Sequence, residues 1–73
     1  MTIDELRTVV REAERQRVPI RVEIGSDWLT FIVKSQPTLR RAVSLDAIEQ
    51  TRYPVGYCLN HLHLLLDDIA STR

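Results

Sequence analysis

The side chains best suited to chemistry in this sequence gather in one short stretch near its end. Cys58, His61, His63 and Asp67 provide a thiol, two imidazoles and a carboxylate. Cys58 and His61 are three residues apart and His63 and Asp67 are four apart, which are the spacings at which side chains meet on one face of a helix. Such pairs are ingredients of nucleophilic catalysis, acid–base catalysis and zinc binding. What they can do depends on the element that carries them.

This stretch lies inside the strongest helical pattern of the chain, which begins near Pro54, a residue suited to the first position of a helix. Its apolar stripe consists of Val55, Cys58, Leu59, Leu62, Leu65, Leu66, Ile69 and Ala70. A free cysteine on such a stripe behaves as a small apolar side chain. His61 and His63 lie about 200° apart on a helix, too far apart to share a metal ion. We therefore expect no catalytic residues, no metal site and no cofactor, and a protein that is not an enzyme.

Length and composition set the scale of the molecule. The chain has 73 residues, of which 10 are basic and 10 acidic, so its formal net charge is +0 with both histidines neutral. This length allows one domain over residues 1–73 and no deep cleft between domains. The charge balance excludes an overall polybasic binder of nucleic acid or membranes. The single cysteine, the lack of a secretory signal at the start and the lack of a long apolar run favour a cytoplasmic protein.

The first half of the chain predicts one helix and two strands. Thr2 and Glu5 form a T-x-x-E capping box, which predicts the start of a helix over residues 3 to 16. Its apolar stripe is Ile3, Leu6, Val9, Val10 and Ala13. Apolar residues then alternate from Val18 to Ile24 and again from Trp28 to Lys34, which predicts two strands.

We expect these two strands to form a β-hairpin. Gly25-Ser26 is expected to be a two-residue type II′ turn, in which glycine takes the first position. That turn would set Val22 opposite Leu29 and Ile20 opposite Phe31, so that both apolar pairs share one face. The core face of the second strand is then Leu29, Phe31 and Val33, and its other face is Trp28, Thr30, Ile32 and Lys34.

The remaining segments complete an α+β fold. A turn at residues 35 to 38 leads to a third strand from Leu39 to Val43. Arg41 has the parity of the core face, and we expect its guanidinium to reach water at the sheet edge. Ser44 is expected to cap a short helical segment over residues 45 to 49. The prediction is a three-stranded antiparallel meander, packed on one face by the N-terminal and C-terminal helices.

The order of elements resembles that of the double-stranded RNA-binding domain. That family gathers lysines at the start of its last helix, where residues 52 to 57 of this chain read Arg-Tyr-Pro-Val-Gly-Tyr. The tight turn at residues 25–26 leaves no counterpart of its histidine-bearing loop. The resemblance covers the order of elements alone. The two departures from the family predict that the chain does not bind duplex RNA. In size, neutrality and lack of catalytic motifs, the chain also resembles small phage-encoded inhibitors of host defence proteins, which implies an inhibitor or accessory role.

The face of the sheet opposite the predicted core offers a candidate protein-binding surface. Trp28 and Ile32 project there, beside Arg21 and Arg40. A tryptophan framed by arginines is typical of the residues that dominate binding energy at protein interfaces. The alternative is that the indole lies against the segment of residues 48 to 53.

Two helical faces also carry side chains that core packing does not require. On the last helix, a second stripe consists of Tyr57, His61, Leu64 and Asp68. It suits a contact with another protein, unless residues 44 to 53 cover it. On the first helix, a basic row consists of Arg7, Arg11 and Arg15. With Arg21 it could bind anions, unless Asp4 and Glu14 neutralise it.

These surfaces predict a small non-enzymatic module that binds another protein by occupying its surface, with homodimers expected because so short a chain gains core by self-association. The binding residues expected are Trp28, Ile32, Arg21, Arg40, Tyr57, His61 and Leu64. The alternative is a module that binds nucleic acid or an acidic partner through Arg7, Arg11, Arg15 and Arg21. Salt separates the two, because phosphate-driven binding weakens steeply as salt rises.

Overall fold

The computed structural model describes residues 1–34 and 38–71. Its elements follow the order α-β-β-β-α-α, and they are α1 (Ile3–Glu14), β1 (Ile20–Ile24), β2 (Trp28–Val33), β3 (Leu39–Ser44), α2 (Leu45–Gln50) and α3 (Pro54–Ser71). The α+β prediction is therefore confirmed. The expected turn at residues 35 to 38 falls mainly on residues 35–37, which lie outside the described residues.

The start of α1 is the predicted capping box. The Glu5 amide donates to the Thr2 hydroxyl at 3.2 Å, and the Thr2 amide donates to the Glu5 carboxylate at 3.0 Å. Each bond satisfies a backbone donor that the helix itself leaves free. The helix ends at Glu14 with Arg15 as its C-cap, two residues before the predicted end, and β1 begins at Ile20 rather than Val18. The helix thus ends before Pro19 and the strand begins directly after it. A residue that precedes proline is disfavoured in helical geometry, which is consistent with both boundaries.

The β1–β2 hairpin has a register different from the predicted one. Val22 lies opposite Phe31 and Ile20 opposite Val33, so the pairing is shifted by two residues. The Gly25 amide donates to the Trp28 carbonyl at 2.8 Å, which leaves Ser26 and Asp27 as the turn.

The predicted type II′ turn is thus wrong, since Gly25 does not adopt the left-handed φ that such a turn needs at its first position. The observed register places Ile24 opposite Leu29, whereas the predicted one would have placed it opposite Asp27. A shift of two residues preserves the side of every side chain, so the predicted faces of the sheet are confirmed.

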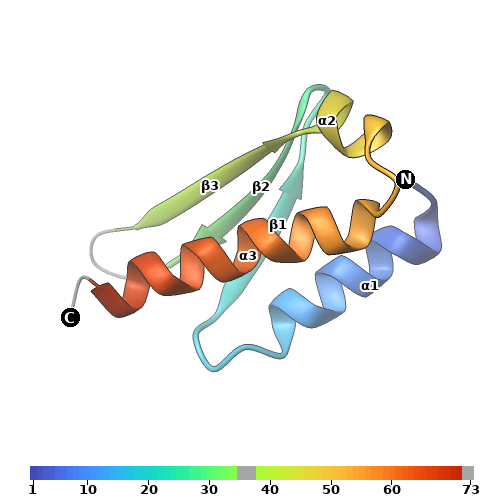
Figure 1. Ribbon diagram of the computed structural model, residues 1–73. Coiled ribbons are helices and arrows are strands. Elements are labelled where there is room, and N and C mark those ends of the chain that lie inside the picture. The colour runs from blue at the N-terminus through green and yellow to red at the C-terminus, as the bar shows by residue number, and fades with distance from the viewer. Residues whose placement is uncertain (35–37, 72–73) are drawn as a thin grey trace.

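β2 is the central strand, with β1 and β3 antiparallel on either side. Leu39 and Val43 lie on the core side as expected. Helices α1 and α3 lie side by side on that same face, and β1 and β3 form the two edges of the sheet (Figure 1). The core between the layers is built chiefly from Val9, Ala13, Leu29, Phe31, Val33, Val43, Cys58, Leu62 and Leu65.

The second half of the chain closes the two-layer structure. The Ser44 hydroxyl accepts from the Ala47 amide at 3.4 Å and caps α2, as predicted. Helix α2 packs on α3 and β3, and Ile48 contributes to the core. Helix α3 begins at Pro54, and its predicted apolar stripe supplies four buried residues, Cys58, Leu62, Leu65 and Ile69.

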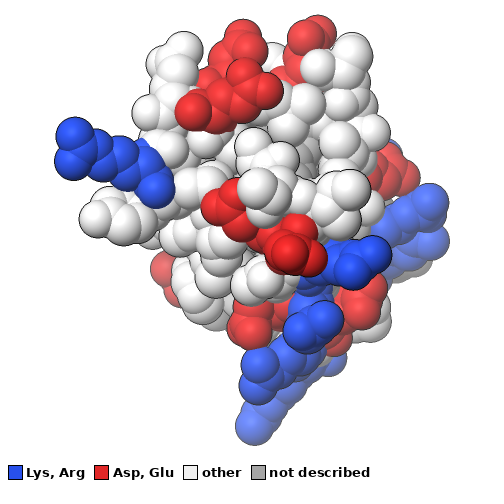
Figure 2. All heavy atoms as spheres, turned by 90° about the vertical axis from the view of Figure 1, so that its right-hand side faces the viewer, with Lys and Arg blue, Asp and Glu red and all other residues white. Residues whose placement is uncertain are grey.

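Charges are unevenly distributed at the end of the molecule where the chain begins. Figure 2 shows separate acidic patches among uncharged side chains at this end, and basic side chains gathered at the lower right and also present on the left. The first turn of α1 contains Asp4 and Glu5, and the first turn of α2 contains Asp46. Within residues 1–34 and 38–71, no helix combines the length and apolar character that crossing a bilayer requires.

Candidate functional site

The sheet face opposite the helices is open. Both long helices pack on the other face, so neither of them covers the outward side chains of the three strands. The register places Arg21, Ile32 and Arg40 in one row across this face, with Glu23, Thr30 and Ala42 in the next. We call this surface the open sheet face.

Trp28 is the most exposed aromatic side chain of the sheet, with 53% of its surface accessible. Its neighbours explain this exposure, because it lies opposite Gly25, which directly follows β1, and opposite Ser44 on β3. Neither neighbour is large enough to cover an indole. The prediction that Trp28 projects to the open sheet face is confirmed, and the alternative in which residues 48 to 53 bury it is wrong.

The backbone holds the indole at a fixed point. The Trp28 carbonyl accepts from Gly25 at 2.8 Å, and the Leu45 amide donates to the Asp27 carbonyl at 3.0 Å. The backbone at the start of β2 is therefore bonded on one side to the residue after β1 and on the other side to the first residue of α2. A large side chain on a rigid strand loses little entropy on binding, which is a property of interface anchors.

Ile32 faces the same side as Trp28 but offers almost no surface. It is 8% exposed, although it does not belong to the core cluster. Its cross-strand neighbours are Arg21 and Arg40, whose long apolar stems can cover it from both sides. Ile32 was expected to contact a partner, but its side chain offers almost no accessible surface for such a contact. It lies between the two arginines in the sheet and is itself buried.

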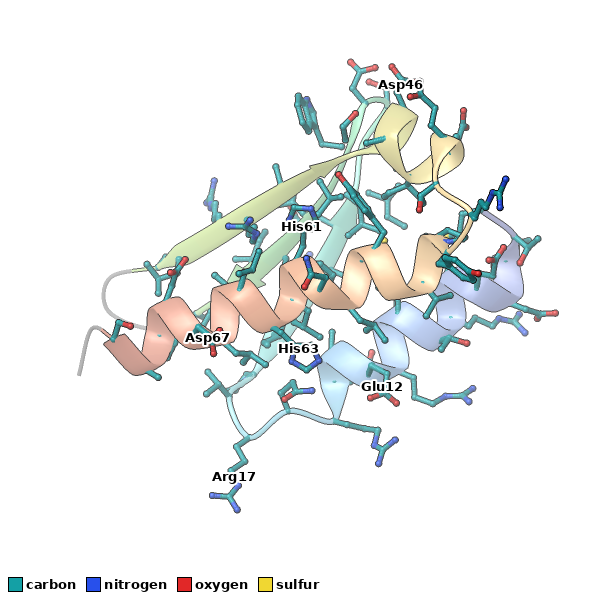
Figure 3. The ribbon with its side chains drawn as sticks, viewed as in Figure 1. Glu12, Arg17, Asp46, His61, His63 and Asp67 are labelled. Atoms are coloured by element: carbon teal, nitrogen blue, oxygen red, sulfur yellow. The ribbon has the colours of Figure 1, made fainter. Side chains whose placement is uncertain are left out.

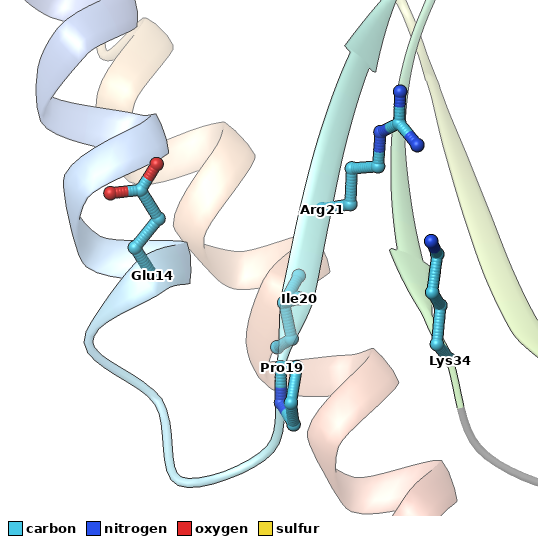
Figure 4. A pocket seen from close by; sticks show the side chains of 5 residues that line it. All are labelled: Glu14, Pro19, Ile20, Arg21 and Lys34. Atoms are coloured by element: carbon cyan, nitrogen blue, oxygen red, sulfur yellow. The ribbon is translucent and has the colours of Figure 1, made fainter.

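Basic side chains surround this part of the open sheet face. Arg21 lies 3.5 Å from Glu23 in an ion pair whose side chains are 62% and 52% exposed, so the pair adds little stability. A hollow of about 360 Å³ lies at the start of β1, lined by Glu14, Pro19, Ile20, Arg21 and Lys34 (Figure 4). Arg21 belongs to β1 and Lys34 directly follows β2, whereas Glu14 belongs to α1.

The predicted second stripe of α3 is largely occupied within the chain. The Arg41 Nε–H donates to His61 Nδ1 at 2.9 Å, and the rings of Tyr57 and His61 meet edge to face at 4.9 Å. Partial burial, reinforced by the positive charge of Arg41, lowers the pKa of His61. The imidazole is therefore held neutral as an acceptor. Leu64, 40% exposed, remains available at the surface.

Arg41 has a partner that the sequence did not predict. It was expected to reach water at the sheet edge; it lies half-buried on the edge strand β3, and its guanidinium donates to His61. Its row on the core face, with Val22 and Phe31, lies where α3 passes over β3. The helix supplies an imidazole at that place, so the guanidinium needs no path to the edge.

The cysteine and the two histidines of α3 do not come together in one site. Figure 3 shows His61 on the side of α3 that faces β3, and His63 on the opposite side. Cys58 is fully buried, and desolvation raises the pKa of its thiol to about 11. A thiol in that state is a poor nucleophile at neutral pH. Within the described part of the chain, no three metal-ligating side chains cluster.

The basic row on α1 is exposed and mostly unpaired. Arg15 donates to Glu12 at 2.9 Å, whereas no ion pair or hydrogen bond joins Arg7 or Arg11 to another described side chain. Among the described residues, Asp4 and Glu14 form no ion pair with this row, and Glu12 pairs with Arg15. Arg7 and Arg11 border a shallow apolar groove of about 390 Å³ along α1.

Sequence reasoning missed two features of these surfaces. It did not pair Arg41 with His61, because the pairing depends on how α3 crosses the sheet. It also did not foresee that the neighbours of Ile32 would cover it. The strand pairing would have revealed the second feature, since both strands place an arginine beside this isoleucine.

Comparison with protein-family models, curated proteins and solved structures finds no match for this chain.

Proposed function

We propose that this protein is a binding module that acts by occupying a surface of another protein, with Trp28 as its anchor. The observation that carries the proposal is the half-exposed indole on a sheet face that no described element covers. Folding alone does not explain it, because a tryptophan placed on the helix side would have added to the core. Exposed tryptophans on rigid strands are frequent binding hot spots.

The charges of the open sheet face indicate the chemistry of the partner. Arg21, Arg40 and Lys34 supply three positive charges, and Glu23 supplies one negative charge. A complementary surface has an apolar pocket for the indole and acidic residues around it. Rim charges of this kind affect the association rate and specificity more than the affinity. A protein that covers such a surface acts as an inhibitor or an accessory subunit.

The test is affinity capture from the native host with the unaltered chain and three variants. Trp28→Ala should lower the affinity for the captured partner by about 30-fold or more, the usual effect of losing an interface hot spot. Tyr53→Ala is the matched control, because Tyr53 is an exposed aromatic residue, at 76%, outside the sheet. We expect it to bind like the unaltered chain.

Arg11→Glu tests the second candidate function, binding of nucleic acid or an acidic partner through the basic row on α1. The observation in its favour is that Arg7 and Arg11 have no described ionic partner. Loss of binding with Arg11→Glu alone, together with a steep decrease of affinity as salt rises, would establish this alternative. Full binding by both Trp28→Ala and Arg11→Glu would exclude both surfaces.

A further inference from the structure

The outer edge of β1 has unpaired backbone groups. The bond from the Gly25 amide to the Trp28 carbonyl makes these two residues a hydrogen-bonded pair of the antiparallel ladder. Such pairs alternate along the strands, so Arg21 and Glu23 direct their backbone groups to β2. Ile20, Val22 and Ile24 direct theirs outward. No described residue bonds to these outward groups.

The sequence of β1 has apolar residues at its centre and at both ends, and residues of opposite charge on the two sides of the centre. β1 reads Ile-Arg-Val-Glu-Ile, with Val22 at its centre. We propose that β1 pairs antiparallel with β1 of a second copy of the chain, with the two Val22 residues opposite each other. Arg21 then lies opposite the partner's Glu23, and Glu23 opposite the partner's Arg21. Opposite charges at cross-strand positions stabilise a sheet.

Charge selects this register over its neighbours. Only residues 20, 22 and 24 point their backbone groups outward, so the pairing can shift only in steps of two residues. A shift in one direction places Arg21 opposite Arg21, and a shift in the other places Glu23 opposite Glu23. Like charges directly opposite each other destabilise a sheet. The other edge, β3, contains Arg40 and Arg41 and no acidic residue, so it has no such complement.

The same pairing covers apolar surface on the helix side of the sheet. Ile24 is 51% exposed at the edge, and the proposed register places it opposite the partner's Ile20. Beside it lies a hollow of about 200 Å³ that Ile24 shares with Ile3 and Leu6 of α1. Ile3 is itself 69% exposed. These residues supply the apolar area that a short strand pairing by itself lacks.

The dimer does not depend on the proposed function of the open sheet face. Joining two β1 strands produces one continuous sheet of twice three strands, with the helices of both copies on the same side. Trp28 belongs to β2 and remains exposed in each copy. The pairing replaces the Arg21–Glu23 ion pair within each copy, two in the dimer, by two such pairs between the strands.

The test uses charge reversal and measures mass by light scattering or sedimentation from about 1 µM to about 1 mM. One chain has a mass of 8.5 kDa, and the unaltered protein should approach twice that value. Arg21→Glu and Glu23→Arg should each weaken dimerisation by at least about tenfold, because each places like charges opposite each other. The double variant Arg21→Glu/Glu23→Arg should dimerise again.

Mixing gives the sharpest outcome. An equal mixture of the two single variants should form a heterodimer, since every Arg then faces a Glu. Val22→Pro removes an outward amide and no bond to β2, so circular dichroism should show an unchanged fold and the mass should be that of one chain. A protein that stays at 8.5 kDa throughout the range would overturn the proposal. So would single reversals that dimerise like the unaltered chain, or a mixture that remains monomeric.

Discussion

Trp28 and Ile32 lie on the same face of the same strand and differ in what their cross-strand neighbours allow. Gly25 and Ser44 leave the indole half exposed, whereas Arg21 and Arg40 leave 8% of the isoleucine accessible. Exposure on this sheet is therefore determined by the side chains on the adjacent strands. We therefore propose a binding role for Trp28 and none for Ile32, whose side chain is buried.

His61 makes a prediction about pH at the residue scale. Its pKa in the folded protein is lowered from the usual 6.5 by burial and by Arg41, so the unfolded chain binds the proton first as the pH falls. The free energy of unfolding should therefore decrease as the pH drops below about 6.5, because protonation also removes the acceptor for Arg41. Urea unfolding at several pH values measures this effect.

Two comparisons isolate the histidine. His61→Gln should lose the part of the pH dependence that lies below about 6.5, while His63→Gln, at an exposed position of the same helix, should keep it. Glu5, whose pKa is lowered from 4.5 by its capping bonds, loses its contribution only in more acid solution. An identical pH dependence in all three proteins would contradict the role assigned to the Arg41–His61 bond.

At the scale of elements, local signals and periodicity predicted most of the fold. The capping box, the Ser44 cap and the stripe of α3 each depend on residues close in sequence, and all three are confirmed. Strand faces were predictable because apolar and polar residues alternate. The hairpin register was wrong because it was assigned from the glycine alone. Three apolar pairs, from Ile20 to Ile24 against Leu29 to Val33, determine it instead.

The candidate site was less predictable than the fold. The direction of Trp28 follows from alternation, which the sequence contains. The burial of Ile32 and the partner of Arg41 depend on distances between elements, which no local pattern encodes. Arg41 lies on the core face by strand register, and its Nε–H donates a hydrogen bond of 2.9 Å to His61 Nδ1 of α3.

Gly25→Ala tests the corrected turn. Gly25 has no left-handed φ, and a β-carbon there would meet the Trp28 carbonyl at an ordinary 3.8 Å. The variant should therefore be as stable as the unaltered protein or more stable by up to about 1 kcal/mol, because alanine restricts the unfolded chain. A type II′ turn led by this glycine would instead lose roughly 1–2 kcal/mol. Equilibrium unfolding in urea separates these outcomes.

At the scale of the whole molecule, the two-layer architecture separates three surfaces. The helices cover one sheet face, the other face presents Trp28 with the charged side chains of β1, and the outward backbone groups of β1 form an open edge. Self-association at the edge and partner binding at the face can therefore occur together. A dimer would present two indoles on one continuous sheet, which would raise the avidity for a partner with repeated sites.

The fluorescence of Trp28, the only tryptophan of the chain, tests the central claim most directly. In the free protein, acrylamide should quench its emission readily, because 53% of the side chain is accessible. On addition of the partner captured by the unaltered chain, quenching should fall by at least about twofold, since a hot-spot side chain is shielded from solvent in the complex. Binding that leaves the quenching of Trp28 unchanged would show that the partner contacts another surface.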